Sequence, residues 1–266
     1  MNLQLSGKRA LVTGGSRGIG KAVAHALASE GVRVVICSRN VEEITKAATE
    51  LSKSTSSDVY GVHADMGNHL SIKALLSETI AKLGGLDILV NNAARVSGGQ
   101  TPDSLLEGND ELLRYDFETK MLGYVRAARE AAPQMMKNQW GRIINISGMA
   151  ARGGVAISAG MRNIALISLT KSLSKELGPY GITSNAVLPG AVITENRKAR
   201  LEMISAKSGV SPATLDLQDA NSTALKRVVA SNEIGGVVTY LCSPLAQSIT
   251  GEALSVAGGG NRTIPY

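Results

Sequence analysis

The feature that most constrains the fold is a repeated alternation of short apolar runs with helical patterns along nearly the whole chain. The runs are apolar throughout instead of alternating with polar residues, which is typical of strands buried on both faces of a parallel sheet. They lie at 9–14, 32–37, 58–64, 86–91, 142–147, 182–187 and 252–257. Repeated β–α units predict a doubly wound α/β fold, which is a Rossmann fold of three layers (αβα) with the sheet between two layers of helices.

Helical patterns fill the segments between these runs. They lie at 18–31, 41–52, 69–84, 109–138, 156–177 and 231–243. Because no linker or low-complexity segment divides the chain, residues 1–266 are predicted to form a single domain. The polar segment 195–227 interrupts the alternation, and we expect it to be a helical insert that acts as a substrate lid.

Composition argues against several classes of protein. Apolar residues make up 44% of the chain and charged residues 19%, an ordinary globular balance. No apolar run approaches the ~20 residues of a membrane span, and the N-terminal stretch carries no secretory h-region. Cys37 and Cys242 are far apart in apolar segments, so we expect buried free thiols in a cytoplasmic protein.

The net charge of +6 raises the question of nucleic acid. The basic residues are scattered and aromatic residues make up only 3%, so stacking platforms and basic stripes are missing. We therefore expect no nucleic-acid partner; a small anionic substrate accounts for the charge equally well. His25, His63 and His69 have no metal-ligand spacing, and we expect no metal.

The first apolar run leads into TGGSRGIG (13–20) and then into a helical pattern. Gly14, Gly18 and Gly20 in this position let the backbone turn tightly and approach a pyrophosphate, which then lies at the helix N-terminus. A glycine triplet between a buried strand and a helix is a strong sign of a dinucleotide site. A purely structural turn is the alternative.

The end of the second run bears on which dinucleotide binds. An acidic residue there would bind the ribose 2′-hydroxyl, but the chain has Ser38 and Arg39 instead. Arg17 in the glycine turn is a second cation within reach, and two guanidinium groups can hold a 2′-phosphate. These residues favour NADP(H), unless both arginines are simply solvated.

At this point the chain resembles the short-chain dehydrogenase/reductase family over nearly its whole length. Besides the glycine turn it carries ADM (64–66), NNAA (91–94), LPGAVIT (188–194) and TGEALSVAGGG (250–260). The resemblance implies further contacts with the dinucleotide and a tetramer, built from like subunits or with an active homologue, with helices 109–138 and 156–177 at one interface. The implied contact residues, beyond those already named, are Ser16, Ile19, Asp65, Met66, Asn92, Ala93, Pro189, Gly190, Ile193 and Thr194.

The family pattern breaks where its chemistry is carried out. Reduction of a carbonyl in the family uses a Tyr acid, a Lys that lowers its pKa, a Ser and an Asn, because the alkoxide product needs a proton. Counting from the flanking motifs places Ala159 at the Tyr, Asn163 at the Lys, Gly148 at the Ser and Lys120 at the Asn. In this respect the chain is similar to an atypical branch of the family that contains an olefin reductase.

Three interpretations remain open. In the first, the protein uses NADPH to reduce a C=C bond conjugated to a carbonyl; the resulting enolate can be stabilised by cations or backbone donors. In the second, it is a catalytically silent subunit. In the third, it reduces carbonyls with a relocated acid such as Tyr124.

The candidate catalytic residues are Tyr124, Lys120 and Ser147, each of which has a purely structural alternative. Tyr124 follows Lys120 by four residues, so both can present on one helix face. Asn163 is expected to keep a ribose contact through its amide. Arg95 and Arg152, with Lys120, suggest a negatively charged substrate.

Overall fold

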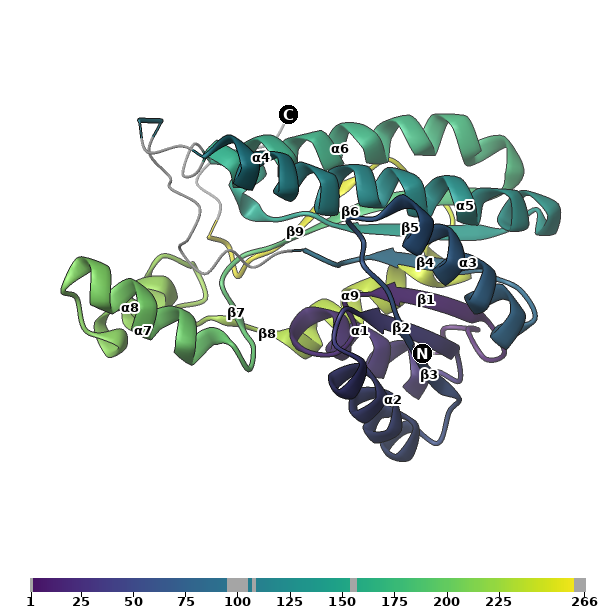
Figure 1. Ribbon diagram of the computed structural model, residues 1–266, viewed down its shortest axis with the longest axis horizontal. Coiled ribbons are helices and arrows are strands. Elements are labelled where there is room, and N and C mark those ends of the chain that lie inside the picture. Colours follow the sequence, from purple (N-terminus) through teal and green to yellow (C-terminus); the bar gives the residue numbers. More distant parts are fainter. Residues whose placement is uncertain (1, 95–104, 107–108, 154–156, 261–266) are drawn as a thin grey trace.

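The computed structural model describes residues 2–94, 105–106, 109–153 and 157–260. Its main sheet has seven parallel strands in the order β3-β2-β1-β4-β5-β6-β9 (Figure 1). The strands are β1 (Arg9–Thr13), β2 (Arg33–Ser38), β3 (Val59–His63), β4 (Ile88–Asn91), β5 (Gly141–Ile146), β6 (Ile182–Pro189) and β9 (Ala253–Val256). All seven predicted apolar runs form strands, and the doubly wound Rossmann fold is confirmed.

Helices cover both faces of this sheet and complete the three layers (Figure 1). One face carries α1 (Gly18–Ser29), α2 (Val41–Thr55) and α9 (Ser231–Cys242). The other carries α3 (His69–Leu83), α5 (Gly123–Asn138) and α6 (Ile157–Leu177), with α4 (Asp110–Asp116) beside α6.

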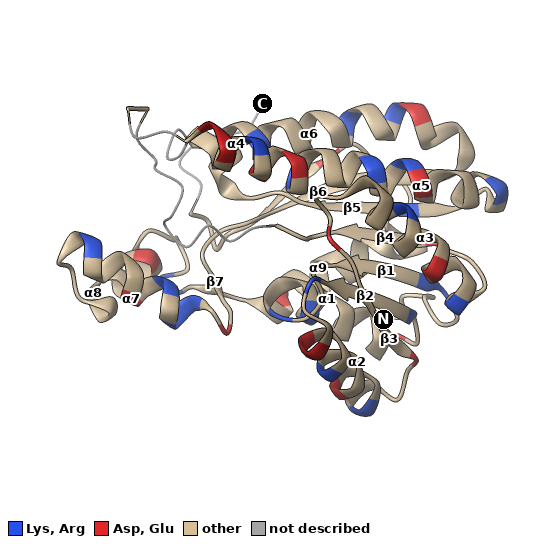
Figure 2. Cartoon of the chain, in the orientation of Figure 1, with Lys and Arg blue, Asp and Glu red and all other residues tan. Residues whose placement is uncertain are grey.

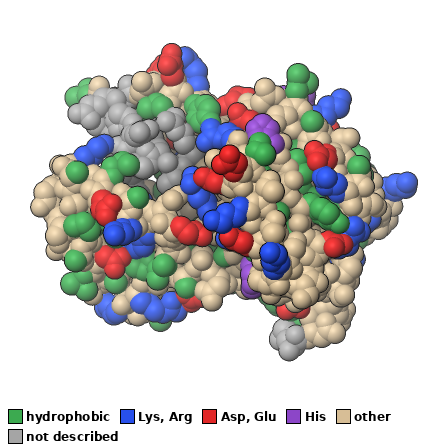
Figure 3. Space-filling view, turned by 60° about the horizontal axis from the view of Figure 1, so that its bottom comes forward, with side chains coloured by type: hydrophobic (Ala, Val, Ile, Leu, Met, Phe, Trp, Pro, Cys, Tyr) green, Lys and Arg blue, Asp and Glu red, His purple; other side chains and the backbone are tan. Residues whose placement is uncertain are grey.

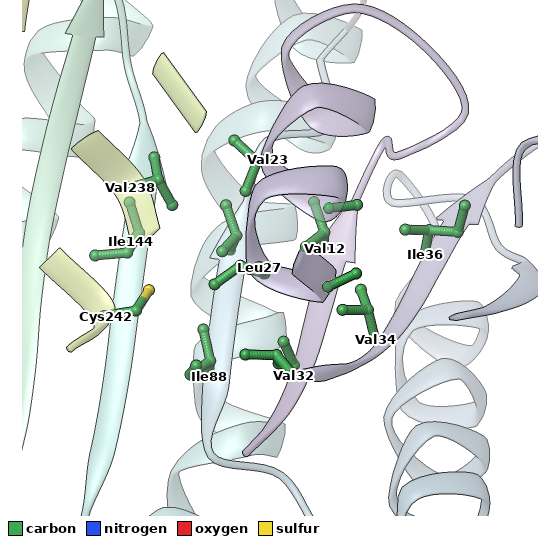
Figure 4. Close-up of a cluster of buried hydrophobic side chains, with 14 of the residues drawn as sticks. Val12, Val23, Leu27, Val32, Val34, Ile36, Ile88, Ile144, Val238 and Cys242 are labelled. Carbon is green, nitrogen blue, oxygen red and sulfur yellow. The ribbon is translucent and has the colours of Figure 1, made fainter. Parts of the chain in front are cut away.

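The core consists of two clusters, one on each face of the sheet. In the first, strand residues meet apolar residues of the covering helices (Figure 4). Its labelled members include Val12, Ile36, Ile88 and Ile144 from the strands, and Val23, Leu27 and Val238 from the helices. β4, β5 and β6 are buried at every residue, which is why they lack a polar alternation, whereas the edge strands β3 and β9 are partly exposed.

Local signals set several helix ends. Asn40 and Asn68 cap α2 and α3, because each side chain accepts a hydrogen bond from a backbone N–H three residues later. Gly84 ends α3 in the left-handed conformation, with φ +74°, where glycine carries no steric penalty.

The predicted helix 109–138 differs in its middle. A π-helical segment, Phe117–Leu122, separates α4 from α5. The hydrophobic pattern of a sequence does not distinguish α from π turns, yet a π segment rotates the side chains that follow it. Lys120 lies within this segment.

Segment 195–227 contains α7 (Arg197–Ser208) and α8 (Pro212–Asn221), which stand apart from the two helical layers (Figure 1). Two strands that the sequence patterns did not predict flank it. They are β7 (Val192–Ile193) and β8 (Val229–Ala230), which pair with each other in parallel. The segment is therefore attached to the main body through a very short two-stranded sheet and, near its end, through a hydrogen bond from the Leu225 N–H to the Gly258 carbonyl oxygen at 3.1 Å.

The surface mixes charges of both signs. Lys and Arg residues are interspersed with Asp and Glu along the helices (Figure 2), and their side chains are mixed on the face shown in Figure 3. Cys37 and Cys242 are buried free thiols, as predicted, and burial raises the pKa of each to about 12. In the described part of the chain, no helix is long and apolar enough to cross a membrane.

An ion pair at the start of two central strands provides a test of stability. The buried Asp87 carboxylate accepts hydrogen bonds from the Arg9 backbone N–H at 3.0 Å, from Nε at 2.7 Å and from Nη2 at 2.8 Å. Replacing Asp87 by Ala is expected to lower the free energy of unfolding by about 2–4 kcal/mol, because three donors lose their acceptor. Denaturant unfolding of the variant measures this loss.

Asp58→Ala is the matched control, since Asp58 pairs with Arg33 at the surface, where ion pairs contribute little. Equal destabilisation by the two variants would show that burial of the Asp87 pair is not what matters.

Candidate active site

The glycine turn after β1 can be formed only by glycines at its key positions. Gly14 and Gly18 have φ of +68° and +57°, and a Cβ on Gly20 would lie 2.2 Å from the Gly14 carbonyl oxygen. The turn delivers the chain to α1, whose first residue is Gly18. The first N–H groups of a helix have no partner within it, so this end of α1 presents donors to an anion.

Asn92 shapes this turn from the neighbouring strand. Its Nδ2 donates to the carbonyl oxygens of Thr13 at 2.9 Å and Gly14 at 3.0 Å. The backbone N–H groups of Asn92 and Ala93 both donate to the Thr13 hydroxyl. Asn92 and Ala93 were both predicted to bind the dinucleotide. The side-chain amide nitrogen of Asn92 instead holds the glycine turn in place.

The predicted phosphate-binding residues lie around the end of β2. Arg39 lines an open hollow of about 680 Å³ with Asn40, and its Nη1 donates to the hydroxyl of Tyr115. The side chain of Arg17 is 57% exposed and lies 3.9 Å from a carboxylate oxygen of Glu43. Neither guanidinium is buried in a structural ion pair.

Two other predicted contacts are more restricted. The Ser38 hydroxyl donates to the Asn40 carbonyl oxygen at 3.0 Å. The Asp65 carboxylate accepts from the Gly67 N–H at 2.9 Å, in the turn after β3. Met66 is 3% exposed and its side chain belongs to the core, so only its backbone can contact a ligand.

The segment after β6 approaches the glycine turn from the other side. Gly190 fits closely against Ala257, since a Cβ at position 190 would lie 2.9 Å from the Ala257 Cβ. The Thr194 methyl group lies 3.5 Å from where a Cβ of Gly18 would stand. Pro189 ends β6, and Ile193 is 53% exposed in β7.

These observations fit a bound dinucleotide. The carboxyl ends of β1, β2, β3, β4 and β6 meet at one edge of the sheet, where the strand order reverses between β1 and β4. Ligands of open α/β sheets bind at such a reversal. Because the glycines have no side chains, a pyrophosphate can approach the protein backbone closely. Arg17 and Arg39 carry the positive charge that a 2′-phosphate would need.

Next to this edge, Lys120 joins the end of β5 to α6. Its Nζ donates to the Ser147 carbonyl oxygen at 3.0 Å and to Asn163 Oδ1 at 2.8 Å. The Ser147 hydroxyl donates to the Asn163 carbonyl oxygen at 3.0 Å. A Cβ on Gly148 would lie 3.0 Å from Asn163 Nδ2. Three of the four positions at which the family pattern breaks, those of Lys120, Gly148 and Asn163, therefore come together with Ser147.

The environment of Lys120 changes its protonation. Burial, and to a lesser extent the charge of Arg162, lower the pKa of Lys120 to about 7, while the Asp116 carboxylate opposes this shift. Asp116 accepts from the Ser158 hydroxyl at 2.7 Å and lies 3.0 Å from Arg162 Nη1. A lysine with a pKa near neutrality can give up or accept a proton at physiological pH.

Sequence reasoning missed Asp116, Ser158 and Arg162. The only available signal was the spacing of Ser158 and Arg162, which are four residues apart and so share a helix face. Arg162 Nε has no hydrogen-bond partner among the described residues, and its Nη1 faces Asp116 without hydrogen-bond geometry. The cluster contains two basic groups and one carboxylate.

The expected proton-donor role of Tyr124 is not supported. Tyr124 does share a face with Lys120, since its hydroxyl donates to the Ile146 carbonyl oxygen at 3.3 Å, beside the carbonyl that Lys120 contacts. However, Tyr124 is 0% exposed and burial raises the pKa of its phenol. Lys120 is also buried, so what separates the two is acidity: burial weakens the Tyr124 phenol as an acid but lowers the pKa of Lys120.

Arg152, one of the residues that suggested a negatively charged substrate, is held by residues of β9. Its guanidinium donates to the Ser255 hydroxyl at 2.8 Å and to the Ala253 carbonyl oxygen at 2.9 Å, which ties it to β9. Arg95 lies outside the described residues. Among the residues that the structure describes, no three His, Cys, Asp or Glu side chains gather as a metal site would require.

Comparison with known proteins agrees with this geometry. The family profile described as Enoyl-(Acyl carrier protein) reductase matches residues 14–261. This chain is a member of the short-chain dehydrogenase/reductase family. It is 32% identical to the NADPH-dependent reductase BacG of Bacillus subtilis, over 98% of this chain and 100% of that protein. It is 34% identical to the 3-oxoacyl-[acyl-carrier-protein] reductase FabG of Aquifex aeolicus, over 97% and 99%.

Among solved structures, L-sorbose reductase from Gluconobacter frateurii, complexed with NADPH and L-sorbose, superposes with a TM-score of 0.93 at 28% identity. The match covers 99% of this chain and 100% of that one. Relatives that depend on NADPH or bind it thus share the whole fold. The chain is an NADPH-dependent reductase of this family, and NADP(H) is its cofactor.

The role of Arg39 in choosing the cofactor can be tested. Replacing Arg39 by Asp is expected to weaken NADP⁺ binding about 10- to 100-fold, because a charge-assisted bond to the 2′-phosphate is replaced by repulsion. NAD⁺ binding should change by less than about threefold. Titration of each dinucleotide by calorimetry measures both dissociation constants.

Lys46→Asp makes the same change of charge on the exposed face of α2 and serves as the control. If Arg39→Asp weakened NADP⁺ and NAD⁺ equally, Arg39 would not recognise the 2′-phosphate.

Proposed function

We propose that this reductase carries out conjugate reduction, adding hydride to the β-carbon of a C=C bond activated by a carbonyl group. The observation that supports it is the buried Lys120, held between Ser147 and Asn163 with a lowered pKa. Under the family correspondence, the Asn and Lys positions hold Lys120 and Asn163, so the two residue types are exchanged. Ala159 and Gly148 then stand at the Tyr and Ser positions.

This arrangement suits an enolate better than an alkoxide. NADPH supplies the hydride when bound. Reduction of a simple carbonyl then needs a strong local acid at oxygen, which the family obtains from Tyr, whereas an enolate spreads its charge and is protonated at carbon. Lys120 has three N–H donors, of which two are used by Ser147 and Asn163. The third can stabilise the enolate oxygen or deliver the proton.

The cluster also supports a negatively charged substrate. Lys120 and Arg162 face a single carboxylate, Asp116, so the local charge is positive whenever Lys120 is protonated. We assign segment 195–227, with α7 and α8, as the lid that encloses such a substrate. The family profile described as an enoyl reductase is consistent with reduction of a C=C bond.

Carbonyl reduction is the second candidate. It is favoured by the similarity to FabG, which is named a 3-oxoacyl reductase. In that case Lys120 would itself act as the acid, since a pKa near 7 places its proton within reach of transfer.

We also propose a tetramer. Met161 and Ile164 expose 44% and 51% of their surfaces on α6, one of the helices expected at an interface. Apolar residues exposed together on a helix are typical of a contact surface.

Parallel assays distinguish the two candidate reactions. NADPH consumption should be faster with small enones that carry a carboxylate than with the corresponding saturated ketones, because only the enone yields an enolate. Product analysis should show a saturated C–C bond and an intact carbonyl. Turnover of ketones alone would contradict conjugate reduction, and NADPH binding without any turnover would favour a silent subunit.

The pH dependence of kcat/KM tests Lys120 as the donor, because kcat/KM reports the pKa values of the free enzyme. Lysine is protonated below its pKa, so kcat/KM should be constant below pH about 7 and fall about tenfold per unit above it. Lys120→Gln should remove this limb and lower kcat about 100-fold or more. Lys137→Gln, on the exposed end of α5, should leave the profile intact. A limb that persists in Lys120→Gln would exclude Lys120.

A further inference from the structure

A carboxylate from the insert occupies a donor in the glycine turn. Glu195 Oε2 accepts a hydrogen bond from the Gly18 backbone N–H at 2.8 Å, although 177 residues separate the two in sequence. Gly18 is the first residue of the 12-residue helix α1. Glu195 directly follows Thr194 and is the first residue of the insert. The contact therefore joins the root of segment 195–227 to the N-terminus of the helix that faces the dinucleotide.

The same N–H group lies where a pyrophosphate is expected to bind. Backbone donors and the positive end of the helix dipole attract anions to this position, whether carboxylate or phosphate. One N–H cannot serve two anions, and two anions at the same helix end repel each other. We propose that Glu195 is a competing anion that the cofactor pyrophosphate must displace, so that cofactor binding releases the root of the lid.

The insert is built so that movement of its root reaches the whole lid. Arg197, two residues after Glu195, is only 8% exposed. Its Nε donates to Asp216 at 2.8 Å and its Nη2 to Asp219 at 2.9 Å, which fastens α7 to α8. The Arg197 N–H also donates to the Thr194 carbonyl oxygen at 3.0 Å, closing the turn that carries Glu195.

The attachment of the insert permits such movement. β7 and β8 pair over only two residues each, Val192 with Val229 and Ile193 with Ala230. Beyond them, α7 and α8 form one unit joined by the Arg197 bridges. The C-terminal end of the insert is also attached to the main body, because the Leu225 N–H donates to the Gly258 carbonyl oxygen at 3.1 Å. Displacement of the Glu195 carboxylate thus acts on a compact body that is held only at its two ends. The expected consequence is ordered binding, in which the dinucleotide enters first and the lid is then able to adjust to the substrate.

Binding measurements test the competition directly. Glu195→Gln keeps the shape of the side chain but removes its charge, and Glu195→Ala removes the contact altogether. Both variants should bind NADP⁺ about fivefold or more tightly than the parent protein, because the pyrophosphate no longer displaces an anion. Adenosine 2′-monophosphate, which has no pyrophosphate, should bind all three proteins within about twofold.

Glu202→Gln is the matched control, because Glu202 carries the same charge in α7 and contacts Lys198 in the same helix. It should leave the NADP⁺ affinity unchanged within about twofold. Unchanged or weaker binding of NADP⁺ by Glu195→Gln and Glu195→Ala would overturn the competition. Tighter binding of adenosine 2′-monophosphate to the same degree would also overturn it, since the effect would then be a general change of charge.

Hydrogen exchange tests the coupling to the lid. Without any cofactor, hydrogen exchange at the backbone amides of α7 and α8 should be faster in Glu195→Ala than in the parent protein. In Glu202→Gln it should be unchanged. NADP⁺ should accelerate the same amides in the parent and have little further effect in Glu195→Ala. Equal exchange in all three proteins would overturn the tether. Both measurements use cofactor alone, so they stand whether the reduced substrate proves to be an enone or a ketone.

Discussion

The reversal of strand order between β1 and β4 is the constraint on which the site depends. The helix that follows β1, α1, covers one face of the sheet, whereas α4 and α5, the helices next after β4, lie on the other face (Figure 1). Thr13 and Asn92 keep the gap fixed, because the Thr13 hydroxyl and the Asn92 amide link the two strand ends. These hydrogen bonds hold the glycine turn in a fixed shape, in which the Gly18 N–H is directed at the Glu195 carboxylate.

Beside the crevice between β1 and β4, an unusual backbone conformation positions a basic side chain. Lys120 projects from a π-helical segment rather than from α6, and reaches Asn163 and the end of β5. A π segment is energetically poorer than an α-helix and tends to persist where it presents a functional group. Under the proposed correspondence, the basic group of the site is carried by Lys120 instead of by a lysine at position 163. The basic group is kept, but the phenol of the family's Tyr is lost.

The sequence patterns predicted the sheet because burial on both faces demands continuous apolar runs, and β5 and β6 show this at every position. They also identified the glycine turn, and they singled out Lys120 and Asn163 individually without predicting the hydrogen bond between them. They failed where geometry depends on distant partners. Nothing local shows that Tyr124 is enclosed, that Arg152 is bound to β9 across about 100 residues, or that Glu195 contacts Gly18. Polar side chains at strand ends have several reachable partners, and only the packed fold selects one.

In the proposed reaction, a lysine takes the place of a more acidic group. Burial, and to a lesser extent the charge of Arg162, lower the pKa of Lys120 to about 7, while the Asp116 carboxylate opposes this shift. An anionic substrate or a forming enolate beside Nζ reverses this balance, because a nearby negative charge favours the protonated lysine. The proton would then be held most firmly while the negative charge is forming and released as that charge is quenched. The cluster of Lys120, Arg162 and Asp116 has two basic groups and one carboxylate. It is therefore suited to a reaction in which the substrate supplies the second negative charge.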